Sequence, residues 1–317
     1  MSTIIDRLEN TPAEALRGIV IMATASAFIP LLDAFGKILV TTYQLPPSEV
    51  SLVRLTLQAA MILPIILLRQ GWNGLKTRNL KVNLLRGALL GVGGIAFFGG
   101  LKFMPLADAT AVFLIEPMVV TLLSALFLKE TVGWRRILAV LVGFAGALII
   151  IRPSYAAFGL ASLLPVAAAT AVAFYLILSR RVSRGTGALA MLFYAGLGGA
   201  ALLALLHLAG FALTIPDLDL VWPREPAAFA LFLVMGLIGT LGHLMFIEAY
   251  RLAPASLVAP FSYIEIVSAI FLGYVLFADL PDVPKFLGIA IIVGSGLFIY
   301  LRERRLSLAA QRAPAEH

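Results

Sequence analysis

The chain has 317 residues, of which 61% are hydrophobic and only 13% are charged, and its mean hydropathy is +1.00. Soluble domains carry about 25% charged residues, so this composition excludes a water-soluble protein and indicates one whose solvent is lipid. The chain contains no cysteine, which excludes disulfides, thiolate nucleophiles and cysteine-based metal sites, and its three histidines are too dispersed for a metal cluster.

Apolar runs long enough to cross a bilayer follow one another almost from end to end, because a spanning helix needs about 20 apolar residues. The fold class that we expect is therefore an all-α integral membrane protein with ten transmembrane helices. We interpret the first run as a retained helix, because Asp33 and Lys37 interrupt it before any convincing cleavage site for a signal peptide. The predicted spans are residues 18–40, 49–69, 84–101, 107–128, 134–151, 158–179, 187–210, 227–250, 255–277 and 284–301.

The basic residues predict the orientation of these spans. An even number of crossings puts both termini on one side of the membrane. With the termini inside, eighteen Lys and Arg residues fall in the inner segments and four in the outer loops, which predicts cytoplasmic termini. We expect a cytoplasmic tail at 302–317 that is loosely ordered from Leu306 onward. Since the formal charge of +7 arises from such loop positions, we expect no nucleic-acid partner.

An internal repeat appears when the sequence is shifted against itself by 149 positions. Aligned apolar residues mean little in a membrane protein, but proline, glycine and carboxylate positions that align at one constant offset are not expected by chance. The aligned pairs include Gly87 with Gly236, Gly93 with Gly242, Pro105 with Pro254, Glu116 with Glu265, Glu130 with Asp279, and Arg136 with Lys285.

The repeat unit is five spans, which predicts two repeats at 18–151 and 158–301. Because five is odd, the second copy must insert upside down relative to the first. Inverted-topology repeats are typical of secondary transporters, in which two similar halves of opposite orientation give outward-open and inward-open states of nearly equal energy.

The sequence also resembles the drug/metabolite transporter superfamily, specifically bacterial members with two tandem EamA domains, over residues 18–301. The resemblance is carried by the number of spans, by "LDAFGK" in the first span, and by the duplicated segments that begin "LKFMPLADATAVFLIEP" and "YRLAPASLVAPFSYIEI". It implies a multi-pass protein of the bacterial inner membrane that exports or exchanges amino acids, metabolites or toxic compounds. Some members of the superfamily instead take up vitamins or nucleoside-like cofactors.

Glu116 and Glu265 are the first candidate site residues, because ionisable groups inside spans are costly and the repeat places these two at matching depth near the bilayer midplane. Desolvation disfavours a charged carboxylate, so either glutamate is a candidate proton acceptor, and an amine-bearing cargo would compete for it. Pro117 and Pro260 predict locally broken helices around them. The alternative is a purely structural pair that satisfies backbone or neighbouring polar groups.

Asp33 and Lys37 lie four residues apart on one face of the first span, and Arg54 lies at an equivalent depth in the second span. One interpretation is an extracellular gate or a cationic site for a cargo carboxylate. The other is a self-neutralising structural set in which Lys37 and Arg54 extend outward to water. Both remain open at this point.

His243 and Tyr263 complete the candidate set, as pore-lining or proton-sharing groups, with ordinary packing as the alternative for each. The glycine-rich "GVGGIAFFGG" is not a nucleotide loop, since no strand precedes it and no Walker lysine follows, so neither ATP nor another cofactor is expected.

The leading hypothesis is a secondary carrier that exports a small, amino-acid-like metabolite by alternating access, with protons as one candidate coupling ion. The alternative is an uptake carrier or exchanger for a vitamin, a nucleoside or an amino-acid derivative. An intramembrane enzyme would need clustered acidic or His and Asp groups near the headgroups, which the sequence lacks, so we expect no enzyme. The sequence does not distinguish a monomer from a homodimer.

Overall fold

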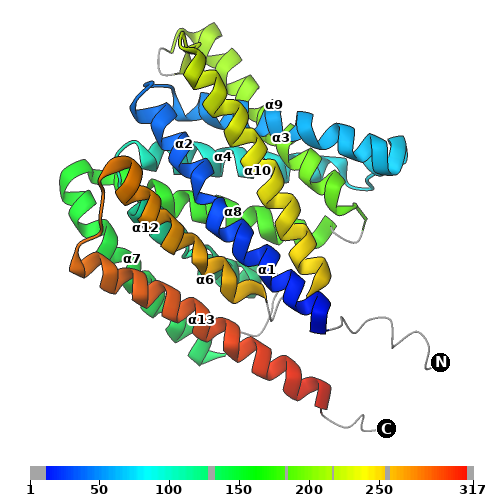
Figure 1. Cartoon of the computed structure of the whole chain (residues 1–317), viewed down its shortest axis with the longest axis vertical. Helices are drawn as coiled ribbons and strands as arrows, with labels where there is room; N and C mark the ends of the chain where they lie inside the picture. The colour runs from blue at the N-terminus through cyan, green and yellow to red at the C-terminus, as the bar shows by residue number, and fades with distance from the viewer. Residues whose placement is uncertain (1–11, 128–132, 183–184, 216–217, 254–257, 313–317) are drawn as a thin grey trace.

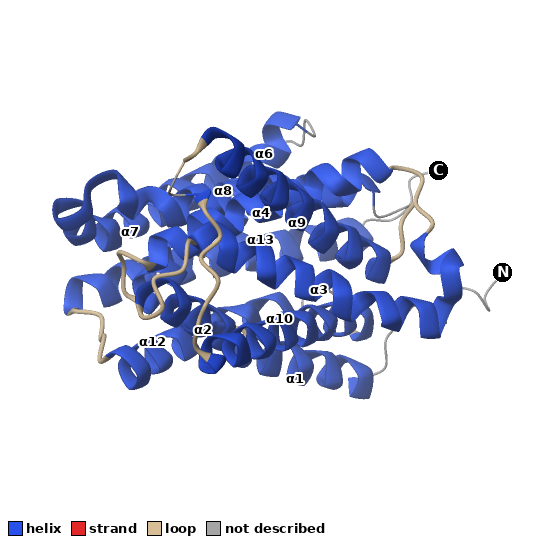
Figure 2. Cartoon of the chain, turned by 90° about the horizontal axis from the view of Figure 1, so that it is seen from above, coloured by secondary structure: helices blue, strands red, loops and turns tan. Residues whose placement is uncertain are grey.

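A computed structural model describes residues 12–127, 133–182, 185–215, 218–253 and 258–312. Within these ranges the chain is helical, and Figure 2 shows helices joined by short loops with no strand. A single isolated antiparallel bridge joins Thr77 to Thr186. The high apolar content therefore folds into helices, which satisfy every backbone hydrogen bond locally, as lipid requires.

Twelve α-helices and three 3₁₀ segments make up the described part of the chain. The α-helices are α1 Pro12–Phe28, α2 Pro30–Thr41, α3 Pro47–Gln70, α4 Leu80–Leu101, α5 Leu106–Phe113, α6 Glu116–Phe127, α7 Trp134–Phe158, α8 Leu164–Val182, α9 Ala188–Leu213, α10 Pro226–Leu252, α12 Ile264–Phe277 and α13 Val283–Arg312. The 3₁₀ segments are η2 Gly71–Leu75, η3 Gly159–Leu163 and η5 Ala259–Tyr263.

Nine segments of the described chain are long and apolar enough to cross a membrane. One of them, Ile137–Ser179, has 43 residues and contains two helices, α7 and α8, which η3 separates at Gly159 (φ +60°). Since about 20 helical residues span 30 Å, this segment accounts for two crossings. The all-α membrane fold is thus confirmed, and the ten predicted spans match nine segments of which one is double.

Both ends of the described chain lie on the same side of the bundle, as Figures 1 and 2 show from two directions. We call the side where α1 begins and α13 ends the terminal face, and the other side the opposite face. Thr77 follows α3 and Thr186 precedes α9, and their hydroxyl oxygens are 2.8 Å apart. The α3–α4 and α8–α9 connections therefore lie side by side, as the predicted alternation of crossings requires.

Three of the membrane-crossing segments are interrupted near their middle. The first is bent at Ile29 before Pro30, between α1 and α2. The fourth is broken at Leu114 and Ile115, between α5 and α6, and the eighth, Pro260–Phe277, begins in the 3₁₀ segment η5 before it becomes α12. Proline lacks the backbone donor and clashes with the preceding turn, so Pro30, Pro117 and Pro260 account for these interruptions. The breaks predicted at Pro117 and Pro260 are confirmed.

The helices pack into two groups that each combine both halves of the chain. In the first group α4, α5 and α6 pack on α8, and in the second group α10, α12 and η5 pack on α1 and α2. The repeat relates α4 to α10 and α5–α6 to η5–α12, and each of these contacts has a counterpart in the other group. Two further pairs, α3 with α9 and α7 with α13, join equivalent helices of the two halves. This pattern is the one that a pseudo-two-fold axis produces, and it supports the inverted repeat.

Candidate functional site

A cavity of about 530 Å³ lies between the two groups, which is within the usual range of about 300–1,000 Å³ for small-molecule sites. Its lining comes from helices of both groups and from α3 and α9. The residues that matter below are Asp33, Arg54, Arg86, Phe97, Phe98, Phe113, Glu116, Tyr175, Ser179, Met191, His243, Tyr250 and Glu265. Five of the seven residues that the sequence singled out, Asp33, Arg54, Glu116, His243 and Glu265, are therefore brought to one cavity.

The three cavity carboxylates occupy equivalent local positions. Asp33 lies in the first turn of α2, Glu116 is the first residue of α6, and Glu265 lies in the first turn of α12. Each therefore follows one of the mid-membrane interruptions. The N-terminal end of a helix carries a partial positive charge, so these positions suit negative groups. Glu265 lies within electrostatic range of both Asp33 and Glu116, which makes the middle of the cavity an acidic site.

Arg54 supplies the cation that faces these acids. It interacts electrostatically with Asp33, and among the described residues its buried Nε–H has no hydrogen-bond partner. A buried donor without a partner is costly, so this group is available to an acceptor on a cargo molecule. Of the three charges that the sequence grouped, Asp33 faces Arg54 whereas Lys37 binds Asp279. Whether this set is structural or serves the cargo stays a prediction.

His243 and Tyr263 lie in different surroundings. His243 lines the cavity, and its Nδ1 lies 2.6 Å from the carbonyl oxygen of Gly239, one turn earlier on α10. Tyr263 is not part of the cavity lining; it precedes α12, and its hydroxyl packs against Gly296 on α13. The contact with Gly239 occupies Nδ1 of His243, so Nε2 is the ring nitrogen that remains for a cargo molecule. The roles assigned to both residues stay predictions.

Aromatic rings form one wall of the cavity. Phe97 makes edge-to-face contacts with Phe113, at 5.2 Å between ring centroids, and with Phe98, at 6.2 Å. Across the cavity Phe246 and Tyr250 line it from α10. Flat faces of this kind suit a cargo with an aromatic ring. The cavity therefore offers both charged groups and ring surfaces.

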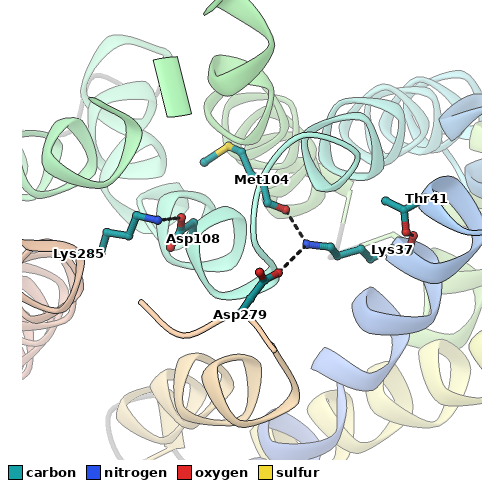
Figure 3. A network of polar contacts seen from close by, with 6 residues as sticks. All are labelled: Lys37, Thr41, Met104, Asp108, Asp279 and Lys285. Carbon is teal, nitrogen blue, oxygen red and sulfur yellow. Dashed lines mark hydrogen bonds and ion pairs between the residues drawn. The ribbon is translucent and has the colours of Figure 1, made fainter. Parts of the chain in front are cut away.

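A network of charged residues lies toward the opposite face, and Figure 3 shows it from close by. Lys37 on α2 donates to the carbonyl oxygen of Met104 at 2.9 Å and pairs with Asp279 at 3.3 Å. Lys285 on α13 pairs with Asp108 on α5 at 2.7 Å. We call these five residues the opposite-face cluster. None of them lines the cavity, and they lie in or next to α2, α5, α12 and α13 near the ends of these helices that point to the opposite face.

The helix contacts between the two groups lie on the same side as the opposite-face cluster. The two groups contact each other where α2 meets α4 and α5, and where α5 meets α12. The segments α2, α5 and α12 are the opposite-face parts of their spans, whereas α1, α6 and η5 are the terminal-face parts. The cavity in turn extends from the midplane toward the terminal face, where Tyr250 is 49% exposed.

Arg86 is the residue that sequence reasoning missed. It was counted among the loop cations that set the topology, but it is 1% exposed and lines the cavity. It donates to Asn83 Oδ1 at 2.8 Å, Ser179 Oγ at 2.7 Å, Tyr175 Oη at 3.0 Å and the Met191 carbonyl at 3.1 Å. We call these five residues the Arg86 cluster. An available signal was Asn83, one turn earlier, which marks a polar helix face rather than a loop.

The described residues hold no group of three or more His, Asp or Glu side chains arranged to bind a metal ion. The site is a cavity with acidic, cationic and aromatic walls.

Comparison with known proteins shows which family this chain belongs to. The sequence matches the EamA-like transporter family twice, over residues 16–152 and 159–301. The chain belongs to the EamA-like transporter family. The family model therefore occurs twice in tandem along the chain, and the repeat bounds at 18–151 and 158–301 stay a prediction.

Several members of the EamA-like family with known names are similar to this chain over most of their length. The riboflavin transporter of Vibrio cholerae is 30% identical over 92% of this chain and 95% of its own. The S-adenosylmethionine uptake transporter of Rickettsia bellii is 29% identical over 86% of this chain and 89% of its own. The riboflavin transporter of Rhizobium johnstonii is 29% identical over 96% of both chains. As a member of this family with such relatives, the chain is a small-metabolite transporter.

A solved crystal structure shares the fold. It is 23% identical in sequence, superposes with a TM-score of 0.60, and covers 89% of this chain and 98% of its own. The arrangement of helices is therefore one that this scaffold adopts in an experimentally determined protein.

Proposed function

We propose that this protein is a secondary transporter that carries a small metabolite through the central cavity by alternating access. The observation that carries the proposal is that the cavity lies between two groups of helices whose main contacts, within the described part of the chain, lie toward the opposite face, where α2 meets α4 and α5 and where α5 meets α12. Rocking of one group against the other would close the terminal face and open the opposite face, as inverted repeats permit. Transport, and not catalysis, is the activity that we assign.

The terminal face is cytoplasmic in this proposal, so the structure is an inward-facing state of a bacterial inner-membrane protein with both termini in the cytoplasm. The support is the excess of eighteen basic residues over four in the segments on that side. Attachment of an impermeant label to a cysteine introduced at the exposed Asn73 of η2 tests this. Labelling in intact spheroplasts would contradict the orientation, and labelling only after lysis is expected.

Uptake is the direction that we propose, with a cargo that contains a flat heteroaromatic ring. Relatives that match over most of the chain are named for riboflavin and for the uptake of S-adenosylmethionine, and both compounds contain such a ring. Phe97, Phe98 and Phe113 offer ring faces, and Arg54 and the acids offer partners for polar substituents. Export, which the wider superfamily suggested, is the second candidate.

The cargo site is tested by ligand-dependent thermal unfolding of the purified protein with riboflavin, S-adenosylmethionine and their analogues. We expect a ligand that stabilises the wild type to lose its effect in Glu116→Gln and in Glu265→Gln. Glu248→Gln is the matched control, because Glu248 is an exposed partner of Arg251 outside the cavity lining. Equal stabilisation of all these proteins would place the site elsewhere. Flux in both directions across proteoliposomes then separates uptake from export.

Proton coupling through Glu116 or Glu265 is the finer part of the proposal. Its support is the placement of both carboxylates in the cavity, each at the start of a helix segment. In proteoliposomes an imposed pH gradient is expected to drive accumulation of the cargo, and Gln at the coupling position would keep exchange but abolish accumulation. Transport that does not respond to the gradient would remove the coupling claim and leave a facilitative carrier.

A further inference from the structure

A second hollow, distinct from the transport cavity, lies between α7 and α13. The two helices touch backbone to backbone at Gly146 and Gly288, where a Cβ atom on either glycine would lie 2.9 Å or 2.8 Å from the carbonyl oxygen of the other. Toward the terminal face they enclose a groove of about 550 Å³. Its lining is Trp134, Arg135, Leu138, Ala139, Val142, Ala290, Ile291, Gly294, Ser295 and Phe298.

The walls of this groove are apolar and accessible from outside the bundle. Leu138 is 53% exposed, Val142 44% and Phe298 48%. No atom lies within 4 Å of the position that a Cβ would take on Gly294, so the groove is open at that point. Because α7 and α13 cross the membrane, this surface faces hydrocarbon. The shape and the chemistry of the walls suit an acyl chain.

Positive charge gathers where the groove meets the terminal face, with one arginine from each helix. The guanidinium of Arg135 lies 5.4 Å from the ring centroid of Trp134, which favours an interfacial position for both. The guanidinium of Arg302 on α13 lies beside Gly133, directly before α7. Two cations at the end of an apolar groove suit a phosphate attached to an acyl chain.

We propose that this groove binds one anionic phospholipid, with an acyl chain between α7 and α13 and the phosphate between Arg135 and Arg302. A second copy of the chain fits less well. A two-fold dimer through this surface would bring the same arginines of both copies together at one end, where like charges repel. The site is separate from the transport cavity, so it does not depend on the proposed function.

Trp134 itself reports the occupancy of the groove. In a protein that keeps Trp134 as its only tryptophan (Trp72→Phe, Trp222→Phe), fluorescence is measured in phosphatidylcholine vesicles that contain a minor fraction of brominated phosphatidylglycerol or brominated phosphatidylcholine. We expect the anionic lipid to quench Trp134 more strongly at equal mole fraction. Arg135→Gln should reduce that preference about fivefold, the effect of one basic residue beside an anionic lipid. Arg78→Gln, an exposed arginine elsewhere on the terminal face, should leave the preference unchanged.

Gly294→Leu tests the acyl-chain part of the site, because its side chain enters open space and should weaken quenching by both lipids. Equal quenching by the two brominated lipids in the parent protein would overturn the proposal, as would an unchanged preference in Arg135→Gln. A dimer in which Trp134 is shielded from both lipids, and which Gly294→Leu dissociates, would assign the groove to a second copy and overturn it as well. Arg135→Gln alters an exposed side chain and keeps the test decisive if Gly294→Leu does not fold.

Discussion

The opposite-face cluster and the Arg86 cluster are both built around buried cations, but they join different parts of the molecule. In the opposite-face cluster, Lys37 on the second group reaches the Met104 carbonyl on the first group. In the Arg86 cluster, Arg86 and its partners Tyr175 and Ser179 all lie on α4 and α8 of the first group, with Met191 on the neighbouring α9. One cluster therefore spans the boundary between the groups, and the other lies on one side of it.

The two clusters also differ in how easily their polar contacts can be broken. The opposite-face cluster crosses the boundary between the groups through the contact of Lys37 with the Met104 carbonyl. Asp279 beside Lys37 is 36% exposed, so water can replace that carbonyl when the groups separate. Arg86 uses neutral acceptors and is buried, so separation would leave several polar groups without partners. We infer that the opposite-face cluster opens and closes during transport, whereas the Arg86 cluster stays intact.

A disulfide between the two groups is expected to have the largest effect on transport. The chain has no native cysteine, and a Cβ on Gly273 of α12 would lie 4.0 Å from Leu106 Cβ on α5, close to the spacing of a disulfide. Oxidised Leu106→Cys/Gly273→Cys should lose nearly all transport, because it ties the two groups together on the opposite face, and a reductant should restore it.

The matched lock is Thr77→Cys/Thr186→Cys, which bridges two connections that both adjoin the first group. Transport measured in proteoliposomes before and after oxidation should be the same for this variant. Loss of transport in both locked proteins would show that the groups are assigned wrongly, since the second lock spans no boundary that is expected to open.

Replacement of Arg86 by Met should lower the free energy of unfolding by about 3 kcal/mol or more, because Asn83, Tyr175 and Ser179 lose a charged donor in a buried site. Thermal unfolding in detergent measures the effect, and Arg78→Met, at an exposed position on the same face, is the control. An Arg86→Met protein that is as stable as the wild type but inactive would assign Arg86 to cargo binding and not to structure.

Asp108→Asn should shift the resting state toward opening on the opposite face. It leaves the mostly buried Lys285 without its counter-ion, and the loss of one partner from a buried pair is costly. With a cysteine at the cavity position Leu32, labelling from the opposite face by an impermeant maleimide should rise about tenfold or more, which corresponds to about 1.4 kcal/mol.

The charge exchange Asp108→Lys/Lys285→Asp should return labelling toward the level of the parent protein, since it restores the attraction. Labelling that stays high in the exchanged variant would indicate local damage to α5 and not the loss of a latch.

Lys37→Gln should act in the same direction but more weakly, by about fivefold at most in the same labelling assay. The pair with Asp279 is 3.3 Å long and its carboxylate is 36% exposed, and ion pairs that water can reach contribute about 0–1 kcal/mol. Glutamine also keeps a donor for the Met104 carbonyl. An effect larger than that of Asp108→Asn would reverse the order of the two contacts and make Lys37 the main latch.

Much of the fold could be predicted because its determinants are local or repeated in the sequence. Prolines explain the breaks beside Glu116 and Glu265, and the constant offset of 149 residues pairs these two acids at equal depth. Spans of continuous apolar residues predict helices, because lipid leaves the backbone no other way to pair its polar groups.

The partners of the buried cations could not be predicted. Lys37 reaches Asp279, 242 positions later in the chain, instead of Asp33 on its own helix face, and Lys285 reaches Asp108 across the two halves. Arg86 is the third residue of the predicted span 84–101, where the end of a span is uncertain by a few residues, so it was counted with the inner basic residues that set the orientation. The bend at Pro30, which puts Asp33 in a first turn, was also missed.

The sequence by itself determined the membrane environment, the order of the membrane crossings, the duplication and the pair of matched acids, since hydrophobicity, proline and repetition act along the chain. Tertiary structure alone decided that each packing group takes helices from both halves, which charges lie in the cavity and which close it. Those outcomes depend on distances between segments far apart in sequence, and residue order does not specify such distances until the helices pack.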